Sequence, residues 1–209
     1  MSGTAFIGGV LCGGRARRMG TSKEALELDG QSFMKLAVDR HRPDYVLLSG
    51  TGHYRGTSTV RDHRTGVGPL AGIESLLGIA GGNRVTDTPA DWLLVSPADA
   101  PLLTSVEIGR LREAAADDRD DLVVLRGGGR VHPLSAAMRV EACLPAVTRL
   151  LDDGVRRADR LMECVRTRLI DIDARRLHNV NTPRDLAEAR RLYAELAAES
   201  GDLQRRPAG

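Results

Sequence analysis

The chain has 209 residues, a length that suits one α/β domain of ordinary size. Its 30 basic and 28 acidic side chains nearly cancel and only 3% of residues are aromatic, which argues against a general nucleic-acid binder. No apolar run reaches the roughly 18 residues of a membrane-spanning helix, the N-terminus lacks a signal-peptide pattern, and the three scattered cysteines suit a reducing cytoplasm.

Strand and helix patterns alternate along the chain. Apolar runs predict strands over residues 6–11, 45–48, 57–61, 92–95, 122–125, 134–138 and 168–172. Apolar residues at three-to-four spacing, with capping signals, predict helices over residues 32–40, 68–80, 104–116, 141–151, 157–165 and 184–198. This order predicts a single-domain, three-layer α/β/α fold with a mostly parallel, Rossmann-like sheet over residues 1–200 and a frayed tail over 201–209.

A glycine-rich, basic loop follows the first predicted strand. Residues 11–23 read Leu-Cys-Gly-Gly-Arg-Ala-Arg-Arg-Met-Gly-Thr-Ser-Lys, with three glycines and four cations. Glycines let backbone N–H groups approach a ligand closely, and cations balance its negative charge, so the loop predicts binding of a nucleotide's phosphate chain. It is neither a Walker loop, because two residues separate Gly20 from Lys23, nor a dinucleotide fingerprint, because Gly13 and Gly14 are adjacent.

Asp99 follows the strongest central-strand pattern, residues 92–95, in an Asp-Ala-Pro sequence. Ligands of open α/β sheets bind outside the carboxyl ends of the strands, so Asp99 and the glycine loop are expected at the same edge. A carboxylate beside a triphosphate suits Mg²⁺, which bridges protein and phosphate oxygens. The alternative is an aspartate that only caps the turn before Pro101.

The loop pattern L-x-G-G-x-x-x-R-M-G-x-x-K resembles that of the MobA-like nucleotidyltransferases, the molybdenum-cofactor guanylyltransferases. Four further segments are similar to motifs of this family and occur in the family's order: Gly-Pro-Leu-Ala-Gly at 68–72, Asp-Ala-Pro at 99–101, His-Pro-Leu at 132–134 and Asn-Val-Asn-Thr-Pro at 179–183. The resemblance runs from about residue 6 to residue 192 and implies the nucleotidyltransferase fold.

The resemblance also implies a nucleotide site. Its residues would be Leu11, Cys12, Gly13, Gly14, Lys23, Asp62 and Asp99. Arg18 and Lys23 would neutralise phosphate charge, and Asp99 would hold Mg²⁺; these three form the expected catalytic set. Asp62 would read guanine, because a carboxylate accepts from both the N1–H and the exocyclic amine, a donor pair that adenine and cytosine lack.

The sequence departs from the family at the end of the second strand. Guanylyltransferases often carry an asparagine there, whereas this chain has Ser-Gly-Thr-Gly at 49–52. CTP therefore stays open as an alternative nucleotide.

An acceptor site is implied by two later segments. Arg156 and Arg157 resemble the family's arginines near the acceptor pocket and would hold the phosphate of a pterin, although a solvated helix start would look the same. Asn179 and Asn181 would face the pterin, while Thr182 and Pro183 suit the first positions of a helix.

The implied reaction is transfer of GMP from GTP to the molybdopterin cofactor, with release of pyrophosphate, in the cytoplasm. A protein that delivers molybdopterin, or a molybdoenzyme that receives the product, is an expected transient partner; nucleic acid and membrane are not. Two alternatives stay open: a nucleotidyltransferase that uses CTP or another phosphorylated acceptor, and a nucleotide-binding regulator without turnover.

Overall fold

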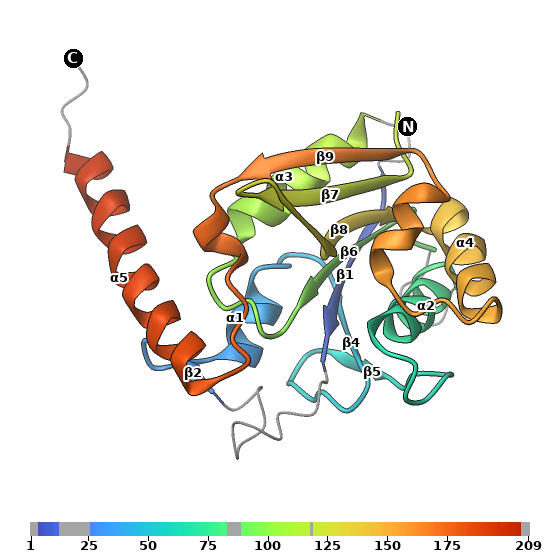
Figure 1. Cartoon of the computed structure of the whole chain (residues 1–209), viewed down its shortest axis with the longest axis horizontal. Helices are drawn as coiled ribbons and strands as arrows, with labels where there is room; N and C mark the ends of the chain where they lie inside the picture. The colour runs from blue at the N-terminus through green and yellow to red at the C-terminus, as the bar shows by residue number, and fades with distance from the viewer. Residues whose placement is uncertain (1–3, 13–25, 83–88, 118, 206–209) are drawn as a thin grey trace.

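The computed structural model describes residues 4–12, 26–82, 89–117 and 119–205, and its centre is a seven-stranded sheet (Figure 1). The strands lie in the order β5–β4–β1–β6–β8–β7–β9, and all are parallel except β8. Their bounds are β1 (Phe6–Leu11), β4 (Val46–Ser49), β5 (Ser58–Val60), β6 (Trp92–Pro97), β7 (Leu122–Gly127), β8 (Arg130–Arg139) and β9 (Thr167–Ile172). The predicted mostly parallel sheet is confirmed.

Helices cover both faces of this sheet, which confirms the predicted three-layer α/β/α fold. The α-helices are α1 (Phe33–Asp39), α2 (Pro69–Ala80), α3 (Ser105–Ala116), α4 (Val140–Asp152) and α5 (Pro183–Arg205). The described residues also form the 3-10 helices η2 (Ala158–Glu163) and η3 (Ala174–Leu177). The apolar sides of α2, α4 and η2 pack on one face of the sheet, and those of α1 and α3 pack on the other.

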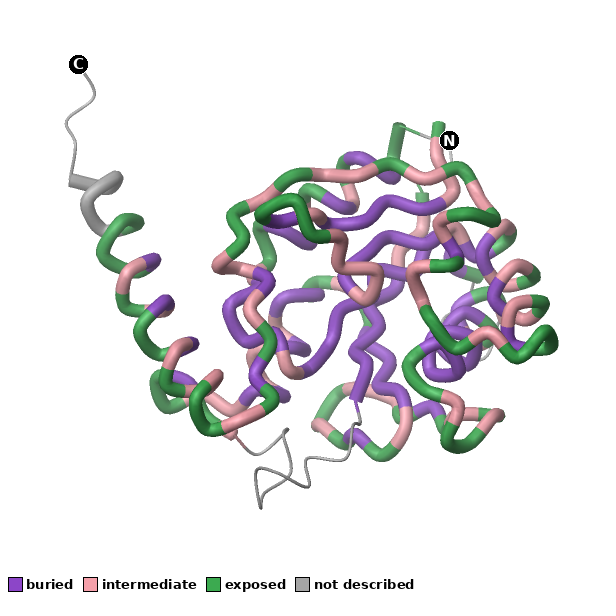
Figure 2. The backbone as a smooth tube through the Cα atoms, in the orientation of Figure 1, coloured by how far each residue is buried: buried purple, intermediate pink, exposed green. Residues whose placement is uncertain are grey.

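β6 shows why the central strands have uninterrupted apolar sequences. Leu93 and Val95 belong to the core beneath α2 and α4, whereas Trp92 and Leu94 belong to the core beneath α3. All four are at most 1% exposed, because both faces of the strand are covered. Each such side chain contributes about 1.5–3 kcal/mol by burial. The buried residues accordingly gather on the central strands, and the exposed ones on loops and outer helix faces (Figure 2).

The C-terminal helix α5 lies along one side of the molecule (Figure 1). The face predicted to be apolar does pack: Ala189, Leu192 and Leu196 are buried, and Ala189 and Leu192 share a core with Leu28 and Phe33. The helix begins at Pro183, as the capping pattern predicts, but it continues to Arg205 instead of ending before residue 200.

Two further elements differ from the sequence prediction. A small hairpin of β2 (Glu27–Leu28) and β3 (Gln31–Ser32) precedes α1, with Asp29 and Gly30 at its turn. Both turn residues have positive φ, as two-residue Asp-Gly hairpins require. The segment predicted as a helix over 157–165 forms the shorter η2 instead. No helix among the described residues is long and apolar enough to cross a membrane.

His41 makes the stability of this fold sensitive to acid. Its side chain is fully buried, Nε2 lies 2.8 Å from the Ser96 hydroxyl, and burial together with the charges of Arg40 and Arg112 lowers its pKa to about 3. The folded protein therefore keeps His41 neutral where the unfolded chain, with a pKa near 6.5, takes up a proton. Because the unfolded state then binds more protons, stability falls as pH drops from about 6.5 toward 3.

We expect this group to lower the free energy of unfolding by about 2 kcal/mol between pH 7 and pH 5, at about 1.4 kcal/mol per pH unit below the unfolded pKa. Urea unfolding at the two pH values measures the difference. His41→Gln, which keeps an amide able to reach Ser96, should flatten the dependence, and His53→Gln, at an exposed position, should not. An equal pH dependence in all three proteins would contradict the assignment to His41.

Candidate active site

The carboxyl ends of β1 and β6 lie side by side and form the centre of the candidate site. Leu11 pairs with Pro97 across the two strands, and the N–H of Ala98 donates to the Leu11 carbonyl at 3.1 Å. The first loop therefore leaves the sheet beside the segment that carries Asp99. Leu11 and Cys12 are buried at this point. The remaining predicted loop residues, Gly13, Gly14, Arg18 and Lys23, lie outside the described residues.

The start of the loop is held by the segment that follows β4. The Ser49 hydroxyl accepts the N–H of Cys12 at 3.2 Å. A Cβ at Gly50 would lie 2.9 Å from the Cys12 carbonyl oxygen, and one at Gly52 would lie 2.5 Å from Cys12 Sγ. The sequence Ser-Gly-Thr-Gly, which departs from the family pattern, therefore gives Cys12 the space it needs against the end of β4.

Asp99 lies in the turn between β6 and α3, at the carboxyl edge of the sheet. Its backbone carbonyl accepts the N–H of Val180 at 2.8 Å, so the Asn-Val-Asn segment is fastened to this turn. Within the described ranges, no group of three or more His, Cys, Asp or Glu residues could enclose a metal ion. A single carboxylate still fits Mg²⁺, which commonly takes one or two protein carboxylates and completes its shell with water and substrate phosphate.

Asp62 lies two residues beyond β5, in a depression of about 410 Å³ lined by residues 58–63 and Ile79. Its Oδ1 is buried and finds no hydrogen-bond partner in the described part of the chain. Burial raises the pKa of Asp62, while the Gly50 backbone amide and the nearby His63 act in the opposite direction. An acceptor atom buried without a donor costs free energy. The side chain as a whole is only half-buried, so the carboxylate also faces the depression, where a ligand N–H could meet it.

A larger cleft of about 980 Å³ opens beside the carboxyl end of β6. Pro69 at the start of α2 and Pro97 at the end of β6 form part of its lining. The β7–β8 hairpin, residues 156–159, η3 with the segment that follows it, and α5 contribute the rest. All four predicted acceptor residues line it: Arg156, Arg157, Asn179 and Asn181. Asp62 is not among the residues that line it, so the predicted base-reading and acceptor-binding groups occupy separate hollows.

Comparison with known proteins identifies the family. The family described as "MobA-like NTP transferase domain" matches residues 8–170. A molybdenum cofactor guanylyltransferase from Rhodopseudomonas palustris (strain BisB5) is 32% identical over 195 residues, which cover 88% of this chain and 91% of that protein. The chain belongs to the MobA-like NTP transferase family. It is thus an enzyme, a nucleotidyltransferase, as the motifs predict.

Solved structures support the same fold. Molybdopterin-guanine dinucleotide biosynthesis protein A from Archaeoglobus fulgidus superposes with a TM-score of 0.73 at 20% identity, over 90% of this chain and 98% of that one. The 2-C-methyl-D-erythritol 4-phosphate cytidylyltransferase from Thermus thermophilus gives 0.66 at 17% identity, over 89% and 98%. At these identities the likeness establishes the nucleotidyltransferase fold alone.

The two adjacent arginines of this nucleotidyltransferase, Arg156 and Arg157, differ in their hydrogen bonds. The Arg157 guanidinium binds the Asp159 carboxylate with two hydrogen bonds, one of them 3.1 Å long. The Arg156 side chain has no hydrogen bond or ion pair within the described ranges, and both arginines are exposed. An exposed ion pair is weak, so Arg157 can still exchange its partner, but Arg156 is the arginine already available to an anion.

Sequence reasoning missed a second available cation, Arg130. It lies at the start of β8, lines the same cleft as Arg156, and its side chain likewise lacks a partner in the described part of the chain. Burial, with the charge of Arg130 as a smaller cause, holds the pKa of the His132 imidazole below its ordinary value. The sequence signal for Arg130 is its place two residues before His132, and the apolar run that predicts this strand begins only at residue 134.

Proposed function

We propose that this nucleotidyltransferase transfers GMP from GTP to molybdopterin, forming the guanine dinucleotide cofactor and pyrophosphate. The main support is the hydrogen bond from Val180 to the Asp99 carbonyl, which joins the segment of Asn179 and Asn181 to the turn of the proposed metal ligand. An acceptor held by the two asparagines would therefore lie beside a nucleotide held at the ends of β1 and β6. The name of the guanylyltransferase relative agrees with this substrate pair.

In the proposed reaction, an oxygen of the acceptor's terminal phosphate attacks the α-phosphorus of GTP. A new P–O–P linkage forms, the bond between the α-phosphorus and the bridging oxygen breaks, and pyrophosphate leaves with the electron pair. No covalent enzyme intermediate is needed, so catalysis consists of positioning and charge stabilisation. Bound Mg²⁺, held by Asp99, would supply neutralisation of the phosphate charge.

The chain's own groups divide this work. Leu11 and Cys12 would form the base of the nucleotide site, the backbone groups of Gly13 and Gly14 would hold the nucleotide, and Arg18 and Lys23 would approach its phosphates. Asp62 would accept hydrogen bonds from guanine. Arg156, with Arg157 as a second cation, would hold the acceptor phosphate, and Asn179 and Asn181 would contact the pterin. The expected setting is the cytoplasm, with brief contact to a molybdopterin carrier or a recipient molybdoenzyme.

A nucleotide screen tests the proposal. Purified protein is incubated with Mg²⁺, molybdopterin and one of GTP, CTP or ATP, and pyrophosphate release is measured. We expect release with GTP that depends on molybdopterin. Release with CTP in place of GTP would support the cytidylyl alternative, and binding of GTP without any release would support a regulator without turnover.

A further inference from the structure

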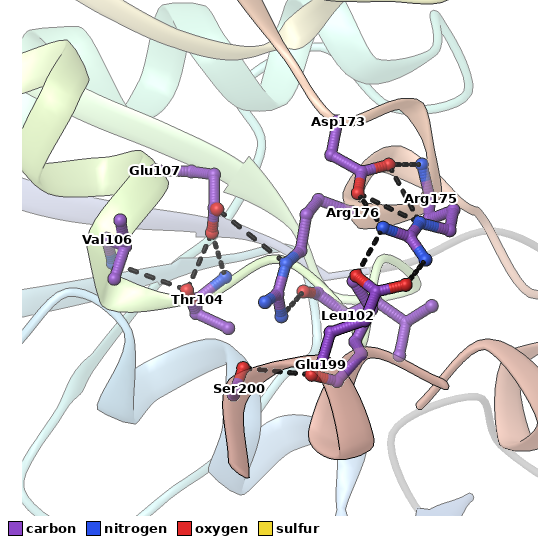
Figure 3. Close-up of polar contacts among 10 residues, drawn as sticks. Leu102, Thr104, Val106, Glu107, Asp173, Arg175, Arg176, Glu199 and Ser200 are labelled. Carbon is purple, nitrogen blue, oxygen red and sulfur yellow. Dashed lines mark hydrogen bonds and ion pairs between the residues drawn. The ribbon is translucent and has the colours of Figure 1, made fainter. Parts of the chain in front are cut away.

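The turn that carries Asp99 is held by a partly buried ion pair, Arg176–Glu107, which neither the motifs nor the proposed reaction uses. Arg176 belongs to η3, and its Nη1 donates to the Leu102 carbonyl at 3.4 Å (Figure 3). Four residues further on, Val180 donates to the Asp99 carbonyl at 2.8 Å. One C-terminal segment therefore fastens the turn at two carbonyls, Asp99 and Leu102.

Glu107 fastens the other end of the same turn. Its Oε2 accepts from the Thr104 backbone N–H at 2.9 Å and from the Thr104 hydroxyl at 2.6 Å. This is the capping box at the start of α3. Its Oε1 lies 3.8 Å from Arg176 Nε (Figure 3). The Glu107 side chain is only 10% exposed, so loss of Arg176 would leave a largely buried carboxylate without this cation.

A second cation lies beneath the turn. Arg40, at the end of α1, is 3% exposed, and its Nε donates to the Leu36 carbonyl at 3.2 Å. Nη1 and Nη2 have no hydrogen-bond partner among the described residues. Burial lowers the pKa of Arg40 to about 10, and the negative charges of Asp99 and Glu107 oppose this shift. The turn is therefore packed against charged side chains, whose burial costs free energy of folding. Apolar side chains in their place would stabilise the fold at least as well.

We propose that Arg176 is a positioning residue, which holds the Asp99 turn in place through Leu102 and Glu107. The proposal rests on the proposed metal role of Asp99. Arg176 itself touches neither substrate nor metal. Its effect is to fix the backbone from which Asp99 extends, and misplacement of a reacting group by about 1 Å can cost as much as 10²-fold in rate.

The chain offers a matched control, Arg168. Arg168 Nη1 binds the Asp117 carboxylate at 2.9 Å, so it links the C-terminal segment to the far end of α3, whereas Arg176 links it to the near end. Arg176→Met and Arg168→Met make the same chemical change at the two ends of one helix. Arg176→Lys keeps the charge but loses the planar fork, and it serves if the methionine variant does not fold.

Two readouts are independent of turnover. Hydrogen–deuterium exchange of a peptide spanning residues 97–106 reports how firmly the turn is held, and Mn²⁺ binding in the presence of GTP, followed by electron paramagnetic resonance, reports the metal ligand. For Arg176→Met we expect faster exchange in this peptide, Mn²⁺ binding weaker by about 10-fold, and kcat lower by about 10-fold with the KM for GTP within about twofold. Arg176→Lys should fall between this variant and the wild type, and Arg168→Met should match the wild type.

The outcomes separate this proposal from the proposed function. If Arg176→Met exchanges, binds Mn²⁺ and turns over like Arg168→Met, the positioning role is overturned. Faster exchange with unchanged Mn²⁺ binding and kcat also overturns it, because the contact would then stabilise the turn without placing Asp99. If the wild type releases no pyrophosphate from GTP and molybdopterin, the proposed function fails, while exchange and Mn²⁺ binding still decide the role of Arg176.

Discussion

Asp99→Ala is expected to abolish Mg²⁺-dependent pyrophosphate release, with a loss of at least about 10²-fold in kcat. Asp99 is the carboxylate at the carboxyl end of β6, and it stands in a turn whose backbone is held by Leu11 and Val180. Loss of the side chain leaves these backbone hydrogen bonds intact. The variant should therefore stay folded, with a somewhat lower melting temperature because the Asp99 charge no longer opposes the cost of burying Arg40, while the neutralisation of phosphate charge is lost.

Two further variants sharpen this experiment. Asp99→Asn keeps the shape of the side chain but removes its charge, and it should be nearly as inactive as the alanine variant. Asp153→Ala removes an exposed aspartate beyond the end of α4 and should leave the rate unchanged. Turnover by Asp99→Ala within a few-fold of the wild type would remove the metal role and leave Asp99 as a residue that caps its turn.

Much of the fold could be predicted because the deciding signals are local. The apolar run at 92–95, for example, is followed directly by the turn of Asp99, so the strand and its ligand-facing end are read from one stretch of sequence. The same holds for the start of α5, because Thr182 and Pro183 are residues typical of the first positions of a helix. The Asp-Gly turn of the β2–β3 hairpin is an equally local signal, although the apolar pattern does not predict strands as short as these two.

The contacts that support the site could not be predicted in this way. Arg176 and Glu107 are far apart in the chain and meet only because η3 follows β9 at one edge of the sheet while α3 packs beside β7. Likewise, the need for glycine at positions 50 and 52 follows from the close approach of Cys12, a contact that the sequence does not reveal. Sequence motifs therefore give the groups that would contact the ligands, whereas the residues that hold those groups depend on the packing of distant segments.

Asp62→Asn is expected to lower kcat/KM for GTP by about 10²–10³-fold. Two hydrogen bonds from guanine to a charged acceptor are each worth about 1.5–3 kcal/mol, and an asparagine amide offers one acceptor and one donor in place of two acceptors. The donor would face an N–H of the base, so one bond is lost and a repulsive contact replaces it. Asp62 is only half-buried and lines the depression after β5, so a base bound there would meet its carboxylate.

ITP provides a matched ligand for Asp62, because hypoxanthine keeps N1–H and lacks the exocyclic amine of guanine. The wild type should prefer GTP to ITP, and Asp62→Asn should lose most of this preference. Since burial raises the pKa of Asp62, protonation as pH falls should weaken GTP binding in the wild type and leave the asparagine variant unaffected. If Asp62→Asn keeps the wild-type ratio of kcat/KM for GTP to kcat/KM for ITP, another group recognises the base. Asp62 would then no longer favour GTP over CTP as the nucleotide.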